Sequence, residues 1–211
     1  PQRERELLAP FCATHPNCRL LATEARLTLY QAWNLGWQAA RAPLLCYSNM
    51  DDAMHPRLLE RVIGTLQRRR LDACTVLTAR QAPEDDLTDF SPARLRRLPL
   101  ILRPGPFSAW RADLAARVGM FDEAYTIAGD REFWSRLGAA RVRVGVVPEV
   151  LYLYTADPAS LAHAGGERRR QEKRRMAAAH PRAGWPARLK WQLRAARLWR
   201  ALAPSRAHPA P

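Results

Sequence analysis

The sequence contains no apolar run that approaches the roughly 18–20 residues needed to cross a bilayer, and no signal peptide is visible. None of its four cysteines belongs to a CxxC pair, so their spacing argues against a metal cluster or a disulfide framework. Reduced thiols in a cytosolic compartment are the simplest interpretation. These absences favour a cytoplasmic globular protein over a membrane-spanning or disulfide-stabilised one.

Acidic residues are scarce toward the end of the chain. Residues 165–211 hold 13 Lys or Arg and 2 Asp or Glu, a net charge of +11, whereas residues 1–164 hold 21 and 18, a net of +3. A basic segment of this kind is attracted to anionic surfaces such as phospholipid, nucleic acid or an acidic partner. We therefore predict a nearly neutral domain over residues 1–164 and a basic helical tail over residues 165–211.

Apolar periodicity predicts alternating helices and short buried strands within the first of these parts. The helices are expected at 26–41, 56–70, 112–118 and 130–140, and the strands at 44–47, 73–78, 142–147 and 150–154. The strand–helix–strand order from residue 44 to residue 78 is typical of a parallel α/β sheet. Because ligands bind beyond the carboxyl ends of such strands, we expect the functional site there.

Polar and acidic side chains stand directly at the end of the first predicted strand, in Asn49-Met50-Asp51-Asp52. A carboxylate at a buried strand end costs stability unless it has a partner, and a divalent cation bound to a diphosphate would be one. Magnesium and manganese prefer oxygen ligands, usually one or two carboxylates plus phosphate oxygens. The alternative interpretation is an N-capping pair for the helix that follows.

A second acidic motif, Gly129-Asp130-Arg131-Glu132-Phe133-Trp134, opens the predicted helix 130–140. An aspartate at a helix start is ordinarily a good cap. The functional alternative is a general base at the helix entrance, facing a cleft. The turn-like motif Gly119-Met120-Phe121-Asp122-Glu123 precedes it closely and gains meaning from that position.

Taken in order, these motifs resemble the inverting nucleotide-sugar glycosyltransferases with the GT-A fold, a family 2-like group. The resemblance covers about residues 17–161 and adds Asn34-x-Gly36, Trp110-Arg111 and Pro148-Glu149-Val150-Leu151-x-x-Tyr154 to the motifs above. It implies an α/β, Rossmann-like fold with a mostly parallel sheet and helices on both faces. Nothing before residue 17 can supply the family's opening nucleotide-binding strand, so we expect an N-terminally truncated domain.

The resemblance also implies roles for the matching positions. Asp51 stands where the family's metal-binding aspartate stands, and Asn49 replaces the first aspartate of the usual Asp-x-Asp, which weakens or removes one metal ligand. Asp130 would deprotonate the acceptor hydroxyl, and His163 falls near a late metal or phosphate contact of some relatives. The residues expected at the nucleotide or in the donor and acceptor pocket are Asn34, Gly36, Asn49, Asp52, Trp110 and Arg111.

We therefore predict a hexosyltransferase-like enzyme of cell-envelope polysaccharide synthesis that uses Mg²⁺ or Mn²⁺. It would transfer sugar from a nucleoside-diphosphate sugar to a hydroxyl of a glycan or lipid-linked acceptor. Residues 187–202 predict an amphipathic basic helix that rests on the inner, anionic membrane face or packs on the catalytic body. The absence of a nucleic-acid motif argues against a nucleic-acid partner. The alternative function is that of a non-catalytic or incomplete relative that binds membrane or nucleic acid through the tail.

Overall fold

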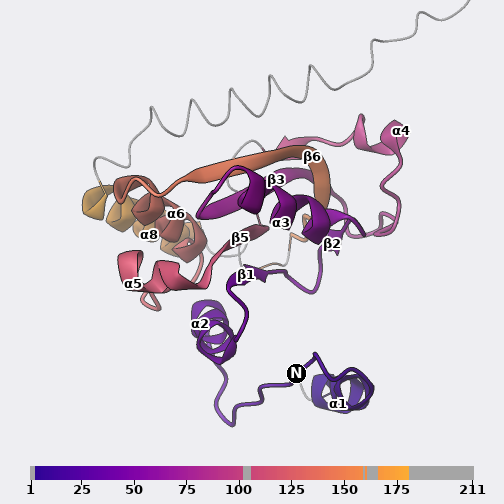
Figure 1. Ribbon diagram of the computed structural model, residues 1–211, viewed down its shortest axis with the longest axis horizontal. Helices are drawn as coiled ribbons and strands as arrows, with labels where there is room; N and C mark the ends of the chain where they lie inside the picture. The colour runs from indigo at the N-terminus through magenta and orange to yellow at the C-terminus, as the bar shows by residue number, and fades with distance from the viewer. Residues whose placement is uncertain (1–2, 102–105, 159, 161–165, 181–211) are drawn as a thin grey trace, which may run out of the picture.

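The computed structural model describes residues 3–101, 106–158, 160 and 166–180 (Figure 1). The predicted helix 187–202 and His163 lie outside these residues. Within the described ranges, six strands form one sheet in the order β1-β5-β3-β6-β2, with β4 paired to β3. The structure is thus α/β, as predicted, with one curled sheet.

Each predicted helix and strand has a counterpart within a few residues of its range, whereas β2, β4, β5, α1 and α4 were not predicted. The strands are β1 (Leu44–Tyr47), β2 (Ala53–Met54), β3 (Ala73–Gln81), β4 (Leu100–Ile101), β5 (Ser108–Arg111) and β6 (Val144–Thr155). The helices are α1 (Glu4–Thr14), α2 (Leu29–Ala39), α3 (Leu58–Arg68), α4 (Pro92–Leu95), the 3₁₀ turn η1 (Ala112–Leu114), α5 (Ala115–Val118), α6 (Gly129–Ala139) and α8 (Gly166–Ala179). No helix in the described part of the chain is long and apolar enough to span a membrane.

The strand directions correct the expectation of a mostly parallel sheet. Only β3 and β6 pair in parallel among the described strands, and the other pairs are antiparallel. β1 and β3 do run in the same direction, as the strand–helix–strand order predicted, but β5 lies between them and is antiparallel to both. The periodicity of a segment does not show which strand lies beside it in the sheet. Here the chain that follows β3 returns as β5 and lies between β1 and β3.

A second correction concerns the two strands predicted at 142–147 and 150–154, which form the single strand β6. Val76 of β3 pairs with Val147, and the next residue, Leu77, pairs with Val150. Pro148 and Glu149 are thus left over at an irregularity of the ladder. Since proline has no N–H to donate, a bulge accommodates it without ending the strand.

Helices cover both faces of the sheet, as predicted. Ala73 and Trp110 contribute to the core cluster that includes side chains from α2, α6 and α8, whereas their neighbours Cys74 and Ala109 pack with α3 on the opposite face. Successive strand residues point to opposite faces, which explains this division. Because α8 adds Met176 to the first cluster, it packs against the body; the domain boundary at residue 164 stays a prediction.

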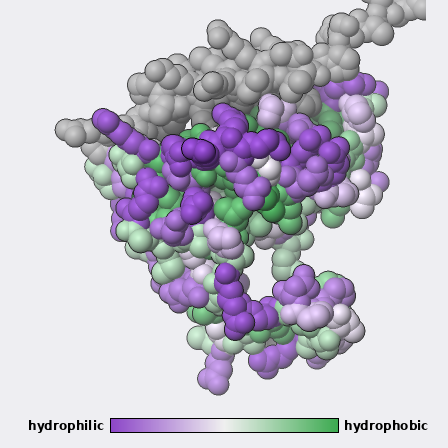
Figure 2. Space-filling model, viewed as in Figure 1, coloured by the Kyte–Doolittle hydropathy of each residue, from purple (hydrophilic) through white to green (hydrophobic). Residues whose placement is uncertain are grey.

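Helix α1 lies apart from the sheet (Figure 1), and the space-filling view shows an opening between it and the body (Figure 2). Its apolar side chains Leu7 and Phe11 are 66% and 50% exposed. The core that positions the pocket is therefore built from α2 onward.

Candidate active site

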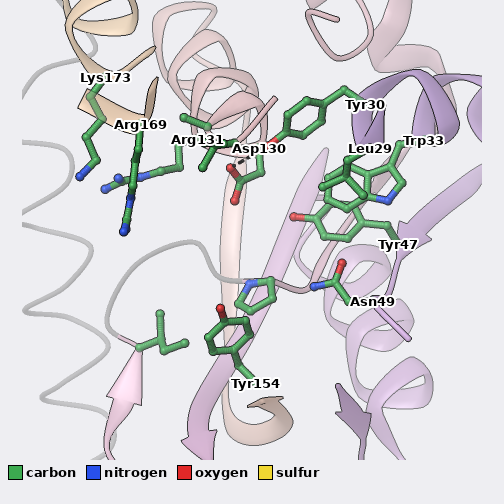
Figure 3. A pocket seen from close by; sticks show the side chains of 14 residues that line it. Leu29, Tyr30, Trp33, Tyr47, Asn49, Asp130, Arg131, Tyr154, Arg169 and Lys173 are labelled. Carbon is green, nitrogen blue, oxygen red and sulfur yellow. Dashed lines mark hydrogen bonds between the residues drawn. The ribbon is translucent and has the colours of Figure 1, made fainter. Parts of the chain in front are cut away.

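A pocket opens at the sheet edge where β1 and β6 end (Figure 3). Side chains reach it from β1 and the following loop, from α2, from the start of α6, from β6 and from α8. The polar members that carry the argument below are Tyr30, Asn49, Asp130, Tyr154, Arg169 and Lys173. The pocket thus joins both acidic motifs at the carboxyl edge of the sheet, where a site was expected.

Asp130 lines this pocket from the first turn of α6. The hydroxyl of Tyr30 lies 3.5 Å from Asp130 Oδ1 and comes from α2, one hundred residues earlier in the chain. Burial and, next, the charge of Asp130 raise the pKa of Tyr30, and the same two causes raise the pKa of Tyr47. Both phenols therefore stay neutral beside the carboxylate.

Gly129 permits the close approach of Tyr30 to the start of α6. A Cβ atom at position 129 would lie 2.6 Å from the nearest ring atom of Tyr30, inside van der Waals contact. The Tyr30 side chain is 1% exposed and is surrounded by other aromatic rings, so it has little room to move. The glycine of the Gly129-Asp130 motif is thus required by packing.

The other members of the motif are occupied in structural contacts. Glu132 is 3% exposed and pairs with Arg136 at 2.8 Å, and His180 lies 2.9 Å from the same oxygen. Phe133 belongs to the core, and Trp134 Nε1 donates to Ser108 Oγ. Asp130 and Arg131 are the charged residues of the motif whose side chains line the pocket.

The loop after β1 is fixed to β6 through Asp52. Its carboxylate accepts hydrogen bonds from the Tyr152 hydroxyl at 2.8 Å, from Asn49 Nδ2 at 2.9 Å and from the Thr155 amide at 2.9 Å. Burial raises the pKa of Asp52, although these hydrogen bonds oppose the rise. Asp52 therefore holds the loop in place, and its expected contact with the donor stays a prediction.

Asp51 and the Asn49 side-chain oxygen form the donor set that a metal could use. Asp51 is exposed at the tip of the loop, and within the described ranges no hydrogen bond or ion pair engages its carboxylate. Asp51 is not part of the pocket lining, but its charge affects Tyr154, which is. The pKa of Tyr154 is raised by burial, then by the charge of Asp52, and further by that of Asp51.

Oxygen ligands of this kind fit Mg²⁺ or Mn²⁺. No group of three or more His, Cys, Asp or Glu side chains able to hold a metal occurs in the described part of the chain. Magnesium usually takes one or two carboxylates and completes its coordination with water and substrate phosphates. The pair Asn49 and Asp51 suits that mode of binding, in which the donor diphosphate would supply further oxygens.

Asn34 occupies a structural position away from the pocket lining. Its buried amide donates to the Phe121 carbonyl at 2.9 Å and to Glu123 Oε1 at 2.8 Å, and it accepts from the Phe121 amide at 3.0 Å. These hydrogen bonds therefore join two motifs that are far apart in the sequence, Asn34-x-Gly36 of α2 and Gly119-x-Phe121-Asp122-Glu123 in the turn after α5.

The remaining predicted residues also lie outside the pocket lining. Trp110 is 3% exposed within the aromatic core, and Arg111 is an exposed partner of Asp113 at 3.1 Å. Gly36 lies on α2, where a Cβ atom would meet nothing within 4 Å. Their nucleotide and pocket roles, like that of Asn34, stay predictions.

Sequence reasoning missed Tyr30 and the pocket-lining cations Arg169 and Lys173 of α8. Tyr30 stands four residues before Asn34 on the buried face of α2, a spacing that could have marked it as a core neighbour of the motif. The cations belong to a helix so rich in charge that no pattern distinguishes its buried face from its exposed one.

Comparison with solved structures places this geometry in a known fold. The mannosyltransferase PcManGT from Pyrobaculum calidifontis, in complex with GDP-Man and Mn²⁺, superposes with a TM-score of 0.64 at 18% identity, over 97% of this chain and 59% of that one. S. aureus TarS gives 0.58 at 14% identity, over 84% and 32%. TarS 1–349 in complex with UDP-GlcNAc gives 0.58 at 13% identity, over 76% and 48%. The chain thus shares their fold while spanning less than two thirds of their length.

Sequence comparison assigns the family. No curated protein sequence matches the chain. The family model described as glycosyl transferase family 2 matches residues 1–117, which include the loop with Asn49 and Asp51. Since this match spans more than half of the 211 residues, the chain belongs to glycosyl transferase family 2.

Proposed function

We propose that this protein transfers a sugar from a nucleoside-diphosphate sugar to a hydroxyl acceptor with inversion, and that Asp130 is the general base. The observation that carries the proposal is the position of Asp130, whose carboxylate lines the pocket at the first turn of α6. The Asn49–Asp51 loop contributes Asn49 to the same pocket. A base and a diphosphate-binding loop are the two parts that such a transfer requires.

In this mechanism Asp130 accepts the proton of the acceptor hydroxyl as its oxygen attacks the anomeric carbon. The bond between that carbon and the leaving diphosphate breaks, and its electron pair stays on the phosphate oxygen. Attack from the face opposite the leaving group inverts the anomeric centre. Tyr30, at 3.5 Å from Asp130 Oδ1, restricts the orientation of the carboxylate.

Asn49 and Asp51 would hold a divalent cation, which neutralises charge on the leaving diphosphate when it is bound. PcManGT was solved with GDP-Man and Mn²⁺ and TarS 1–349 with UDP-GlcNAc, which supports a nucleotide-sugar donor and a divalent metal for this chain. We further propose a glycan or lipid-linked acceptor of the cell envelope. The basic tail would bring the enzyme to the inner membrane face.

The test is the Asp130→Asn variant of the intact protein as the cell produces it. With Mn²⁺ and GDP-mannose or UDP-N-acetylglucosamine, the variant should keep donor binding and lose about 10²–10⁴-fold in turnover, because a general base is removed. Asp86→Asn is the matched control, since among the described residues Asp86 accepts hydrogen bonds only from Thr88 of its own exposed loop. Transfer or donor hydrolysis is measured with and without Mn²⁺.

Two results would contradict the proposal. Near wild-type turnover of Asp130→Asn removes Asp130 as the base. Absence of transfer and of donor hydrolysis by the wild-type protein with a broad donor panel favours the alternative of a non-catalytic relative.

A further inference from the structure

Helix α8 carries a buried carboxylate that the mechanism above does not use. Most of this helix is exposed and basic, yet Glu172 is only 7% exposed. Burial of an ionised carboxylate is costly unless hydrogen bonds replace the lost water. The contacts of Glu172 therefore indicate why it is there.

Glu172 binds the backbone that leads into α6. Its Oε1 accepts from the amide and the hydroxyl of Thr126, both at 2.8 Å. Its Oε2 accepts from the amides of Ile127 at 3.0 Å and Ala128 at 2.8 Å. Burial acts to raise the pKa of Glu172, but these hydrogen bonds lower it overall, so the carboxylate is ionised at neutral pH.

The helix that receives this carboxylate has no cap of its own. Ala128 occupies the N-cap position of α6 and has no side chain that can accept a hydrogen bond. An anion at this end also offsets the partial positive charge of the helix terminus. Glu172, more than forty residues later in the chain, supplies both functions from α8.

Asp130 follows Ala128 by two residues, so the segment that Glu172 holds is the one that presents the proposed base. Tyr30 limits Asp130 on the other side, at 3.5 Å. The charged and titratable groups facing Asp130 from the elements around it are Tyr30 of α2, Tyr47 of β1, Arg131 of α6, Tyr154 of β6, and Arg169 and Lys173 of α8. Glu172 lies on the same helix as the last two, between them in sequence.

We propose that Glu172 is a positioning residue for the transfer reaction, acting through the 126–128 backbone to orient Asp130 and to set its basicity. The inference rests on the proposed function, since it assigns Asp130 as the base. The charge of Glu172 also acts at Tyr30, where it is one of the causes that raise the pKa of that phenol.

The direction of the electrostatic effect follows from the sign of the charges. Glu172→Gln removes a negative charge near Asp130 and withdraws it from the positive end of α6, whose first turn then holds only Asp130 and Glu132 as acidic residues. Loss of that negative charge favours the ionised form of Asp130. The rate rises with pH as the base loses its proton, so the acid limb of the kcat/KM profile should move to lower pH. The shift expected from one helix terminus is about half a pH unit.

The experiment compares Glu172→Gln, Glu172→Asp and Glu167→Gln in the intact protein. Glu167 is the matched control, because it is exposed on the same helix and pairs with Arg170. We expect Glu172→Gln to lower kcat by about 10–100-fold through misplacement of the base. The donor KM should stay within about two-fold of wild type, since the diphosphate loop is untouched. Glu172→Asp, which keeps the charge on a shorter side chain, should lower kcat without moving the acid limb.

Amide hydrogen exchange provides a readout that does not depend on activity. Exchange at Thr126, Ile127 and Ala128 should accelerate in Glu172→Gln and remain at the wild-type rate in Glu167→Gln. Thermal melts give the folded fraction, so that kcat can be expressed per folded molecule.

Three outcomes overturn the inference. One is unchanged exchange at residues 126–128 in Glu172→Gln. Another is faster exchange with wild-type kcat and an unmoved acid limb, which leaves Glu172 as a purely structural cap. The third is a loss of rate that disappears per folded molecule. An active Asp130→Asn variant would instead remove the proposed function itself, and the two failures are therefore distinguishable.

Discussion

Replacement of Gly129 by alanine tests whether the start of α6 is shaped by its contact with Tyr30. The added Cβ atom would lie 2.6–2.8 Å from three ring atoms of Tyr30, so either the ring or the helix must move. Tyr30 is 1% exposed and packs on Trp33 and Phe121, with ring centroids 5.4 and 5.9 Å away. Relief of the clash therefore has to displace other core rings as well.

The size of the effect is the difference of two terms. Overpacking of a well-filled core costs about 1–3 kcal/mol. Alanine is better than glycine in a helix by about 0.5–1 kcal/mol, which offsets part of that cost. The net loss in the free energy of unfolding is about 0–2.5 kcal/mol, which lowers Tm by up to about 10 °C in a protein of this size.

Gly138 of the same helix is the matched control, because a Cβ atom there would meet nothing within 4 Å. Gly138→Ala should leave stability unchanged or raise it by up to about 1 kcal/mol. The stability of the two variants is measured by urea unfolding and by Tm. Turnover per folded molecule should fall only in Gly129→Ala, because there Tyr30 shifts beside Asp130. The reasoning fails if Gly129→Ala is as stable as Gly138→Ala, since the contact would then impose no constraint.

Two further variants test the loop after β1 and the amino end of β3. Tyr152→Phe removes the hydroxyl that donates to Asp52 at 2.8 Å, so it should lower the free energy of unfolding by about 1–2 kcal/mol. It should also raise the Mn²⁺ concentration needed for half-maximal activity. An unchanged Mn²⁺ titration would argue against a role of this loop in metal binding. Asp72 has a pKa below its ordinary 3.8, because the hydrogen bonds and charges of Arg143 and Arg117 outweigh the effect of burial. A lowered carboxyl pKa contributes stability above the unfolded-state value, and this is lost as pH falls through the folded value. Asp72→Asn should thus cost about 1–3 kcal/mol at pH 7. Urea unfolding at pH 7 and pH 3 should show this difference shrink at the lower pH, and a constant difference would contradict the assignment.

The longer helices and the apolar strands were predicted because their periodicity is local, whereas β2, β4 and β5, of two to four residues each, were not. The apolar run Leu44–Tyr47 became β1 with the predicted bounds, and Gly119, with φ +75°, ends α5 as a helix C-cap. Strand adjacency was not predictable in the same way. The place of β5 between β1 and β3 depends on contacts between distant segments, and no periodicity records those contacts.

Some residues of the candidate site could be predicted from the sequence and others could not, for the same reason. Asp130 and the Asn49–Asp51 loop stood out because acidic residues follow or precede apolar runs in the sequence. Trp110 and Asn34 also stood out, yet Trp110 is a core side chain, and the side-chain amide of Asn34 donates hydrogen bonds to Phe121 and Glu123. A motif marks residues that are constrained, and only the folded geometry separates constraint by packing from contact with a ligand.

The capping of α6 by Glu172, a residue of the later helix α8, has a consequence for biosynthesis. Tyr30 and Asp130 are separated by 100 residues, and Glu172 reaches back 44 to 46 residues to the segment before Asp130. Since a chain leaves the ribosome from its N-terminus, α2 and α6 are both synthesised before α8 exists. Contacts of large sequence separation are also slow to form, because loop closure must precede them. A nascent chain that stops short of residue 172 therefore holds the sheet and both acidic motifs without the carboxylate that caps α6. Under the proposed roles of Asp130 and Glu172, the full rate of transfer would be reached only when α8 docks.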